Sequence, residues 1–306
     1  MTGNSDKHSV VVYLFAVLAM ILWSLSFIWS TIVFEYYRPV TTILIRLVIS
    51  ALLLQLLLFI ARKREKINPR HYKLFLLSSL FNPFLYFLGE NYGLMMTSPT
   101  ISAVIIGLIP LFTPIAGFFF LGEKLSNLNI VGMVVSFLGI LIMLVRPDLT
   151  FAASPLGVGL LFFAVIMAVF YSVLLRRLAA SYSALTIIAT QNLIGIFYFI
   201  PLFFMLDYEH FISVRPDTRV IFAILQLAVF ASTAAYVLYT KATKILGISR
   251  TNAFTNLIPV FTAFFSWIII GEEFGAAKLS GMMIVISGVA LTQYKRSGKV
   301  DTKPDT

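Results

Sequence analysis

The hexapeptide LIPLFT at residues 108–113 returns as LIPVFT at residues 257–262, and a Gly-Glu pair follows each copy, at residues 122–123 and 271–272. Each hexapeptide lies in a strongly apolar stretch that is long enough to cross a lipid bilayer. A repeat of this kind indicates a duplicated pair of membrane helices.

The repeat extends well beyond the hexapeptide. Residues 101–141 align with residues 250–290 without a gap at an offset of 149, and ten of the 41 aligned positions are identical. The starts of the two halves also echo each other, because Trp23 and the serine after it recur as Tyr171 and its following serine. The duplication therefore covers most of the chain.

The composition indicates a membrane protein. Hydrophobic residues make up 59% of the 306 residues and charged residues only 12%, which is too apolar for a soluble globular protein. A spanning helix needs roughly 20 apolar residues to cross a hydrocarbon core about 30 Å thick. Ten segments meet that length: residues 10–31, 38–61, 72–94, 98–121, 127–146, 155–175, 183–206, 219–240, 249–270 and 276–294. We predict an all-α membrane protein with ten transmembrane helices, the first retained and not cleaved as a signal peptide.

The formal net charge of +10 follows the predicted topology. Of the 23 basic residues, 17 fall in the two tails and in the alternate links on their side, whereas the opposite links hold five. Basic residues favour the cytoplasmic side of a membrane, so we expect both termini in the cytoplasm. A nucleic-acid partner is not expected.

An odd number of spans in each half predicts inversion. With five helices in residues 1–148 and five in residues 149–306, the second half enters the membrane upside down relative to the first. Inverted repeats are the usual scaffold for alternating access in secondary transporters. The sequence therefore predicts a transporter more readily than a receptor or an intramembrane enzyme.

These features resemble the drug/metabolite transporter superfamily, specifically its EamA-type family, over nearly the whole chain. An early Trp-Ser at Trp23 and an arginine within the second segment, Arg46, belong to the resemblance. The most specific feature is a proline, a Gly-Glu pair twelve residues later and then Gly-x6-Gly, at Pro110, Gly122-Glu123, Gly132 and Gly139 and again at Pro259, Gly271-Glu272, Gly281 and Gly288. The offset of 149 places Gly195 opposite Arg46, so the repeat is imperfect there. The resemblance implies carriage of small metabolites, often export of amino acids or related compounds.

Arg46 and Glu90 are the only arginine and glutamate clearly inside the predicted spans of the first half. Counting 1.5 Å per residue places Arg46 roughly 12 Å and Glu90 roughly 6 Å from the outer helix ends. Ionisable groups inside a membrane are costly and are usually paired or functional. We expect an ion pair or a proton- or substrate-responsive coupling site; the alternatives are a structural salt bridge and a Glu90 that merely reaches the interface.

Pro110 and Pro259 lie near the middle of the fourth and ninth segments. A proline inside a helix removes a backbone donor and frees a carbonyl one turn earlier. Lipid cannot satisfy that carbonyl, so it should face protein or a watery cavity. We interpret the two prolines as symmetry-related hinges that line the transport path, with a static kink as the alternative. Glu123 and Glu272, at helix junctions, are expected to cap the following helices, or else to act as gate contacts.

Polar and aromatic side chains within the spans are the candidates for binding substrate. Besides Glu90, they are Trp23, Asn82, Tyr86, Asn91, Tyr171, Tyr236, Tyr239, Asn252, Thr255 and Asn256. Substrate sites in such folds lie near the midplane, with aromatic walls and a few placed polar groups. Interhelical hydrogen bonding by the amides and lipid packing by the rings are the alternatives. Gln191-Asn192 is similar but has no counterpart in the second segment.

The predicted function is a secondary transporter that moves a small neutral or zwitterionic metabolite, such as an amino acid, across a plasma membrane or bacterial inner membrane. Phosphate-loop and hydrolase motifs are missing from the sequence, so neither ATP drive nor enzyme chemistry is expected. With no cysteine and with three histidines outside the spans, we expect no metal site and no cofactor. The lipid bilayer and the solute are the expected partners, with the chain as a monomer or a homodimer. A membrane sensor or assembly protein without flux is the rival.

Overall fold

The computed structural model describes residues 3–121, 127–145, 151–246, 251 and 254–294. Helices account for nearly all of this part, and its only β-contact is an isolated bridge between Val145 and Phe151. In chain order the elements are α1 (Gly3–Phe34), α2 (Pro39–Ile60), η1 (Pro69–His71), α3 (Tyr72–Ser79), η2 (Leu80–Leu85), α4 (Tyr86–Met95), α5 (Pro99–Ile106), α6 (Ile109–Leu121), α7 (Asn127–Leu144), α8 (Pro155–Ala179), α9 (Ala184–Leu202), η3 (Phe203–Asp207), α10 (Tyr208–Ser213), α11 (Thr218–Gln226), η4 (Leu227–Ala234), α12 (Ala235–Leu246), η5 (Phe254–Asn256), α14 (Leu257–Ile270) and α15 (Ala276–Tyr294). The predicted all-α class is confirmed.

Seven helices in the described part are long and apolar enough to cross a membrane, judged by length and composition. They are Val11–Phe34, Pro39–Ile60, Pro99–Ala116, Asn127–Leu144, Pro155–Ala179, Ala184–Ser213 and Thr218–Thr243. Phe254–Ile270 and Ala276–Leu291 are apolar but shorter. The predicted span at residues 72–94 is not among the seven. The count of ten therefore stays a prediction.

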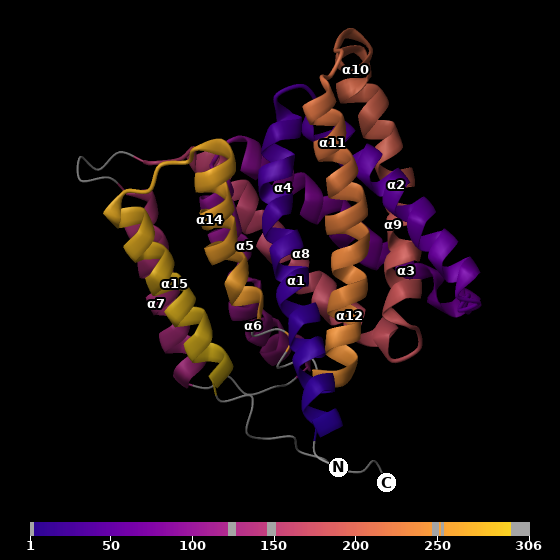
Figure 1. Ribbon diagram of the computed structural model, residues 1–306, viewed down its shortest axis with the longest axis horizontal. Helices are drawn as coiled ribbons and strands as arrows, with labels where there is room; N and C mark the ends of the chain where they lie inside the picture. Colours follow the sequence, from indigo (N-terminus) through magenta and orange to yellow (C-terminus); the bar gives the residue numbers. More distant parts are fainter. Residues whose placement is uncertain (1–2, 122–126, 146–150, 247–250, 252–253, 295–306) are drawn as a thin grey trace.

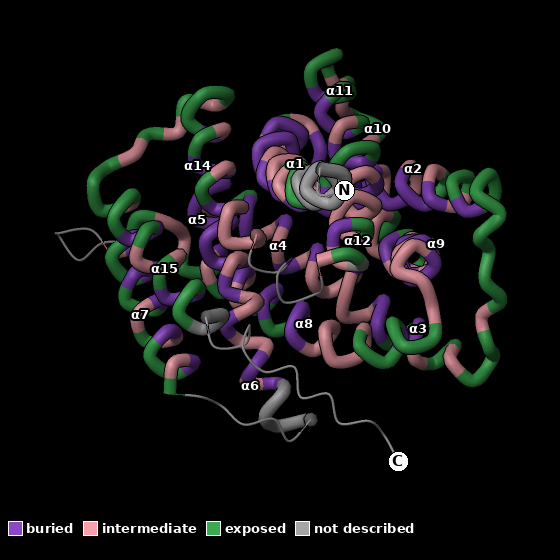
Figure 2. The backbone as a smooth tube through the Cα atoms, turned by 60° about the horizontal axis from the view of Figure 1, so that its bottom comes forward, coloured by how far each residue is buried: buried purple, intermediate pink, exposed green. Residues whose placement is uncertain are grey.

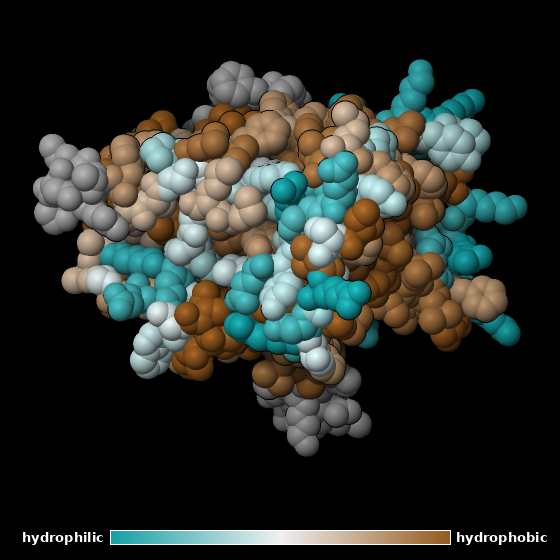
Figure 3. Space-filling model, turned by 90° about the horizontal axis from the view of Figure 1, so that it is seen from above, coloured by the Kyte–Doolittle hydropathy of each residue, from teal (hydrophilic) through white to brown (hydrophobic). Residues whose placement is uncertain are grey.

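The helices lie side by side along one direction, as Figure 1 shows. The start of α1 and the end of α15 lie at the same end of the molecule, at the bottom of that view. In Figure 2, buried positions gather on α1 and α5, while the α2–α3 link is largely exposed. Figure 3, a view onto one end of the molecule, shows hydrophobic side chains interspersed with hydrophilic ones. Strongly exposed hydrophobic residues such as Phe197, Phe204 and Phe222 suit contact with lipid.

The two repeated helices, α7 and α15, pack against each other through glycines. A Cβ on Gly281 would come within 2.6 Å of the Gly139 carbonyl oxygen, and a Cβ on Gly288 within 2.7 Å of the Gly132 carbonyl oxygen. Ser136 Oγ donates to the Val285 carbonyl at 3.2 Å. The helices run antiparallel, so Gly139 faces Gly281, which is the repeat equivalent of Gly132. In the same way Gly132 faces Gly288, which is the repeat equivalent of Gly139. Small residues allow backbones to approach this closely, which explains why the repeat keeps them.

Several helices are interrupted halfway along their length. Asn82 in η2 has extended backbone angles (φ −146°, ψ 120°), and two residues separate the end of α5 at Ile106 from the start of α6 at Ile109. The element η4 is a π-helical segment, which leaves backbone carbonyls without their usual partners. Two carbonyls of this segment accept side-chain donors from the first half: Ala231 O from Trp23 Nε1 at 3.2 Å, and Ser232 O from Ser50 Oγ at 3.0 Å. Protein thus supplies the partners that lipid could not.

Candidate transport pocket

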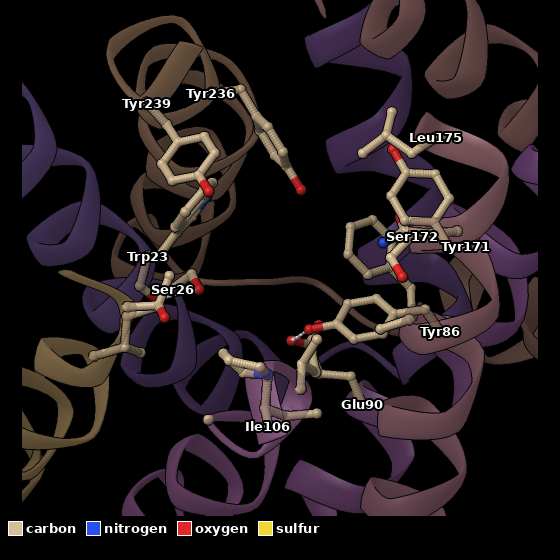
Figure 4. Close-up of a pocket in the computed structure, with 18 of the residues that line it drawn as sticks. Trp23, Ser26, Tyr86, Glu90, Ile106, Tyr171, Ser172, Leu175, Tyr236 and Tyr239 are labelled. Carbon is tan, nitrogen blue, oxygen red and sulfur yellow. Dashed lines mark hydrogen bonds between the residues drawn. The ribbon is translucent and has the colours of Figure 1, made fainter. Parts of the chain in front are cut away.

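A cavity of about 350 Å³ lies where the interrupted helices meet. Its size is within the range of small-molecule sites. Eight of the eleven predicted substrate-binding residues line it: Trp23, Asn82, Tyr86, Glu90, Tyr171, Tyr236, Tyr239 and Thr255. Figure 4 shows them approaching from opposite sides, with Trp23, Tyr236 and Tyr239 facing Tyr86 and Tyr171 across the space. We call this cavity the transport pocket.

Aromatic rings form one wall of the transport pocket. The Trp23 ring packs edge-on against Tyr236 and at a tilt against Tyr239, with both centroid distances 5.1 Å. The Trp23 indole is held in place by its bond to the Ala231 carbonyl. Rings fixed in this way offer a large apolar surface with polar edges, which suits an amphipathic solute.

Glu90 supplies the carboxylate of the pocket. Tyr86 OH donates to Glu90 Oε1 at 2.7 Å, from one helical turn earlier on α4 (Figure 4). Asn91 Nδ2 lies 3.4 Å from Glu90 Oε2 and donates more closely, at 2.9 Å, to the Phe87 carbonyl. The carboxylate is therefore oriented by neighbours on its own helix and presents an edge to the cavity.

Arg46 supplies the guanidinium, and its side chain is buried, with 5% exposed. Its Nε donates to Ser232 Oγ at 3.0 Å, and its Cζ lies 4.5 Å from the centre of the Phe87 ring. Although both charged residues line the transport pocket, the described part of the chain contains no ion pair between Arg46 and Glu90. The direct-pair alternative is thus corrected: the guanidinium is held by a hydroxyl and an aromatic face. The coupling alternative stays a prediction.

Pro110 follows the two-residue interruption between α5 and α6, and Pro259 follows the change from the 3-10 turn η5 to α14. Pro110 is the second residue of α6 and Pro259 the third residue of α14, each in a first turn that requires no backbone donor. The expected freed carbonyl at Ile106 belongs instead to the end of α5, where Gly107 and Leu108 separate the two helices. Pro110 lines the transport pocket, and Pro259 packs 3.3 Å from the position of a Cβ on Gly107. A hinge at each break stays a prediction.

Glu272, just after the C-terminal end of α14, connects α14 with α5 and α15 through hydrogen bonds. Its carboxylate accepts hydrogen bonds from Ser266 and Lys278, and from Thr100 at the start of α5 at 2.8 Å. Burial raises the pKa of Glu272, but the bonds from Lys278 and Ser266 outweigh burial and hold that pKa below its ordinary value. The Thr100 contact joins residue 100 of the first repeat to residue 272 of the second, a link that the expected capping role did not include. Glu123 lies outside the described residues.

The comparison with known proteins follows the same two halves. The EamA-like transporter family matches residues 10–145 and again residues 155–294. This chain belongs to the EamA-like transporter family. It is therefore a member of the drug/metabolite transporter superfamily and a multi-pass integral membrane protein.

Relatives of this EamA-like transporter come from bacteria and archaea. It is 26% identical over 255 residues to the "Uncharacterized transporter YetK" of Bacillus subtilis, covering 82% of this chain and 76% of the relative. An "Uncharacterized transporter" of Archaeoglobus fulgidus is 23% identical over 280 residues, covering 91% and 97%. A solved structure, "Crystal structure of protein", matches with a TM-score of 0.67 and 17% identity, covering 92% of this chain and 98% of the other. That likeness concerns the fold alone.

Two predicted substrate-binding residues in the described part of the chain, Asn91 and Asn256, are not in the lining of the EamA-like transporter's pocket. Asn91 is buried, with 1% exposed, and supports Glu90 from behind. Asn256 ends η5 beside the pocket without lining it, and Asn252 lies outside the described residues. Asn256 lies in the 3-10 turn of residues 254–256, and its role in substrate binding stays a prediction.

Sequence reasoning missed Phe87, Ser232 and Phe27. The first two hold Arg46, and Phe27 lines the pocket from α1. Phe87 carries a usable signal, because it follows Tyr86 and precedes Glu90 on the same short helix. The role of Ser232 depends on the π-helical segment η4, which contains neither proline nor glycine and has no evident mark in the sequence.

Proposed function

We propose that this chain is a secondary transporter for a small zwitterionic metabolite, such as an amino acid, which binds between Arg46 and Glu90. The observation that carries the proposal is that two opposite charges line one cavity without pairing to each other. A buried charge is costly unless a partner compensates it. A solute that carries both a carboxylate and an ammonium group would compensate both charges at once.

The rest of the transport pocket supports the same class of solute. Its volume of about 350 Å³ leaves room for a side chain beyond the charged groups. The rings of Trp23, Tyr236 and Tyr239 would take the apolar part of that side chain. A multiply anionic solute would want more cationic groups than the single guanidinium of Arg46.

For the transport cycle we propose alternating access between two inverted five-helix repeats, residues 1–148 and 149–306, with ten spans in all. The repeat in the sequence supports this, as does the packing of α7 on α15 through equivalent glycines. The interruption before Pro110 and the 3-10 turn before Pro259 are the proposed hinges. Loop charges support cytoplasmic termini, and we propose a bacterial inner membrane and export as the direction.

The decisive experiment is counterflow of labelled amino acids into proteoliposomes loaded with unlabelled ones, with and without a pH gradient. Accumulation of one solute, lost in Arg46→Ala and in Glu90→Gln, is the expected result. Accumulation that persists in both variants would overturn the assigned site. Silence across the amino-acid panel would overturn the proposed substrate class, and silence across a wider metabolite panel would favour a sensor or assembly protein without flux.

A further inference from the structure

A second, smaller cavity lies behind the wall of the transport pocket. Its volume is about 20 Å³. Four side chains line both cavities and form the partition between them: Asn82, Phe87, Tyr171 and Tyr236. The polar residues Gln191, Asn192 and Ser232 line only the smaller one. We call it the polar chamber.

Irregular backbone creates the polar chamber. The extended angles of Asn82 interrupt the helix on one side, and the π-helical segment η4, which carries Ser232, lies on the other. From α9, Gly195 approaches so closely that a Cβ there would lie 2.6 Å from Pro83 Cγ. Gln191, one turn before Gly195, therefore reaches the space behind the break.

The amides of the polar chamber have hydrogen-bonding capacity to spare. Gln191 accepts from Tyr171 OH at 3.0 Å and donates to Ser78 Oγ at 2.9 Å. Asn192 donates to Ser50 Oγ at 3.1 Å. A carboxamide has two N–H donors and an oxygen with two lone pairs, so these bonds use only part of what each amide offers. Within the described chain, the Asn82 side chain makes no hydrogen bond at all.

The size and the lining of the chamber restrict what it can hold. A space of about 20 Å³ suffices for one water-sized group, which needs roughly 10–15 Å³ by the same measure. Amides offer donors and acceptors together, which suits a group that both donates and accepts. A cation is disfavoured because Ser232 already receives the Nε–H of Arg46, which places positive charge beside the chamber. A carboxylate is too large and donates nothing.

We propose that the polar chamber is a subsite for one neutral hydroxyl-sized group, either a water molecule or the terminal hydroxyl of the transported metabolite. The second source rests on the proposed transport function, whereas the first does not. Tyr171, held by Gln191, and Tyr236 then stand at the entrance from the transport pocket. Asn192 and Gln191 become determinants of solute specificity if the metabolite is the source.

The first test is an experimental structure of the full chain in lipid nanodiscs, at a resolution that shows ordered water. We expect density within hydrogen-bonding distance of the Gln191 and Asn192 amides, and we expect it to disappear in Asn192→Leu. Should that variant fail to fold, Asn82→Leu is the substitute, because Asn82 contributes no hydrogen bond within the described structure. An empty chamber in the unmodified protein would overturn the proposal.

The second test separates the two sources by counterflow with threonine and valine, which differ by one hydroxyl in place of a methyl group. If the metabolite's hydroxyl enters the chamber, the threonine-to-valine ratio should fall about 10-fold or more in Asn192→Leu. An unchanged ratio together with density in the chamber would assign the site to water. Thr186→Val is the matched control, buried on the same helix but outside both cavities, and should leave the ratio unchanged. If neither threonine nor valine is transported, the proposed amino-acid substrate class is wrong. The density in the polar chamber still shows whether the chamber holds a hydroxyl-sized group.

Discussion

Gly139 of α7 and Gly281 of α15 meet backbone to backbone, with space for a Cβ at neither position. Each is the repeat equivalent of a glycine on the opposite helix, since Gly132 corresponds to Gly281 and Gly139 to Gly288. These two helices occupy equivalent positions in the repeat, and they pack closely on each other across the two halves. Their contact depends on the residues that the repeat retains.

The first prediction concerns this contact. Gly281→Ala should destabilise the protein by about 1–3 kcal/mol, because the new methyl group would overlap the Gly139 carbonyl and must push the helices apart. Thermal unfolding in detergent measures the effect. Gly159→Ala is the control, since nothing lies within 4 Å of its Cβ position in α8 and alanine favours helix. Equal melting temperatures for the two variants would contradict the close packing.

The second prediction concerns the carboxylate of the pocket. Glu90→Gln should lower transport of a zwitterionic solute about 10- to 100-fold, because hydrogen bonds to charged groups contribute roughly 1.5–3 kcal/mol. The loss should appear in the counterflow assay. Glu209→Gln makes the same change at an exposed residue of α10 that is outside the pocket, and it should transport normally. Full activity of Glu90→Gln would remove the carboxylate from the site.

The third prediction concerns the helix breaks. Replacing both Pro110 and Pro259 with alanine should slow transport several-fold while leaving solute affinity nearly intact, because the two half-helices would gain backbone donors that stiffen each junction. The chain has no cysteine, so single cysteines introduced for spin labels can report the distance between α6 and α12. If the double variant and the unmodified protein exchanged between the spin-labelled conformations at the same rate, the breaks would be static kinks.

The fourth prediction concerns pH. Because the pKa of Glu272 is lowered in the folded protein, its stabilising contribution is present above the pKa it has when unfolded. That contribution is lost as the pH falls through the lowered value, in the acid range. Glu272→Gln should therefore melt at a lower temperature than the unmodified protein near neutral pH, and the difference should shrink in acid.

The neighbouring Glu273 provides the matched control for that experiment. It is exposed, and Glu273→Gln should leave the melting curve nearly unchanged at every pH. A difference between Glu272→Gln and the unmodified protein that stayed constant from neutral to acid pH would show that the carboxylate does not act through its charge. Thr100→Val should reproduce part of the effect, because it removes the donor from α5.

Helix positions and most of the pocket could be predicted from the sequence, because both follow from local patterns. The length of each apolar segment predicts a span. Aromatic or amide residues within such a span are predicted to line a cavity. This reasoning identifies Trp23, Tyr86, Glu90 and Tyr171.

What could not be predicted depends on backbone irregularity. The sequence of residues 227–234 does not indicate a π-helical segment. The hydrogen bond from Arg46 to Ser232 in that segment could therefore not be predicted. Pro110 does lie in mid-span, but whether a proline bends a helix or starts a new one depends on Gly107 and Leu108 before it. The 3-10 turn that contains Asn256 was likewise not predicted from the sequence.

Gly195 has a consequence for the direction of transport. A side chain there would collide with Pro83, so the second half cannot supply a counterpart of Arg46, and at the same offset of 149 Tyr239 stands where the first half has Glu90. If the halves exchange conformations, the chemistry facing the solute does not exchange with them. Under the proposed alternating-access cycle, we expect the solute to load at different rates from the two faces of the membrane. The gradient alone still decides the final balance.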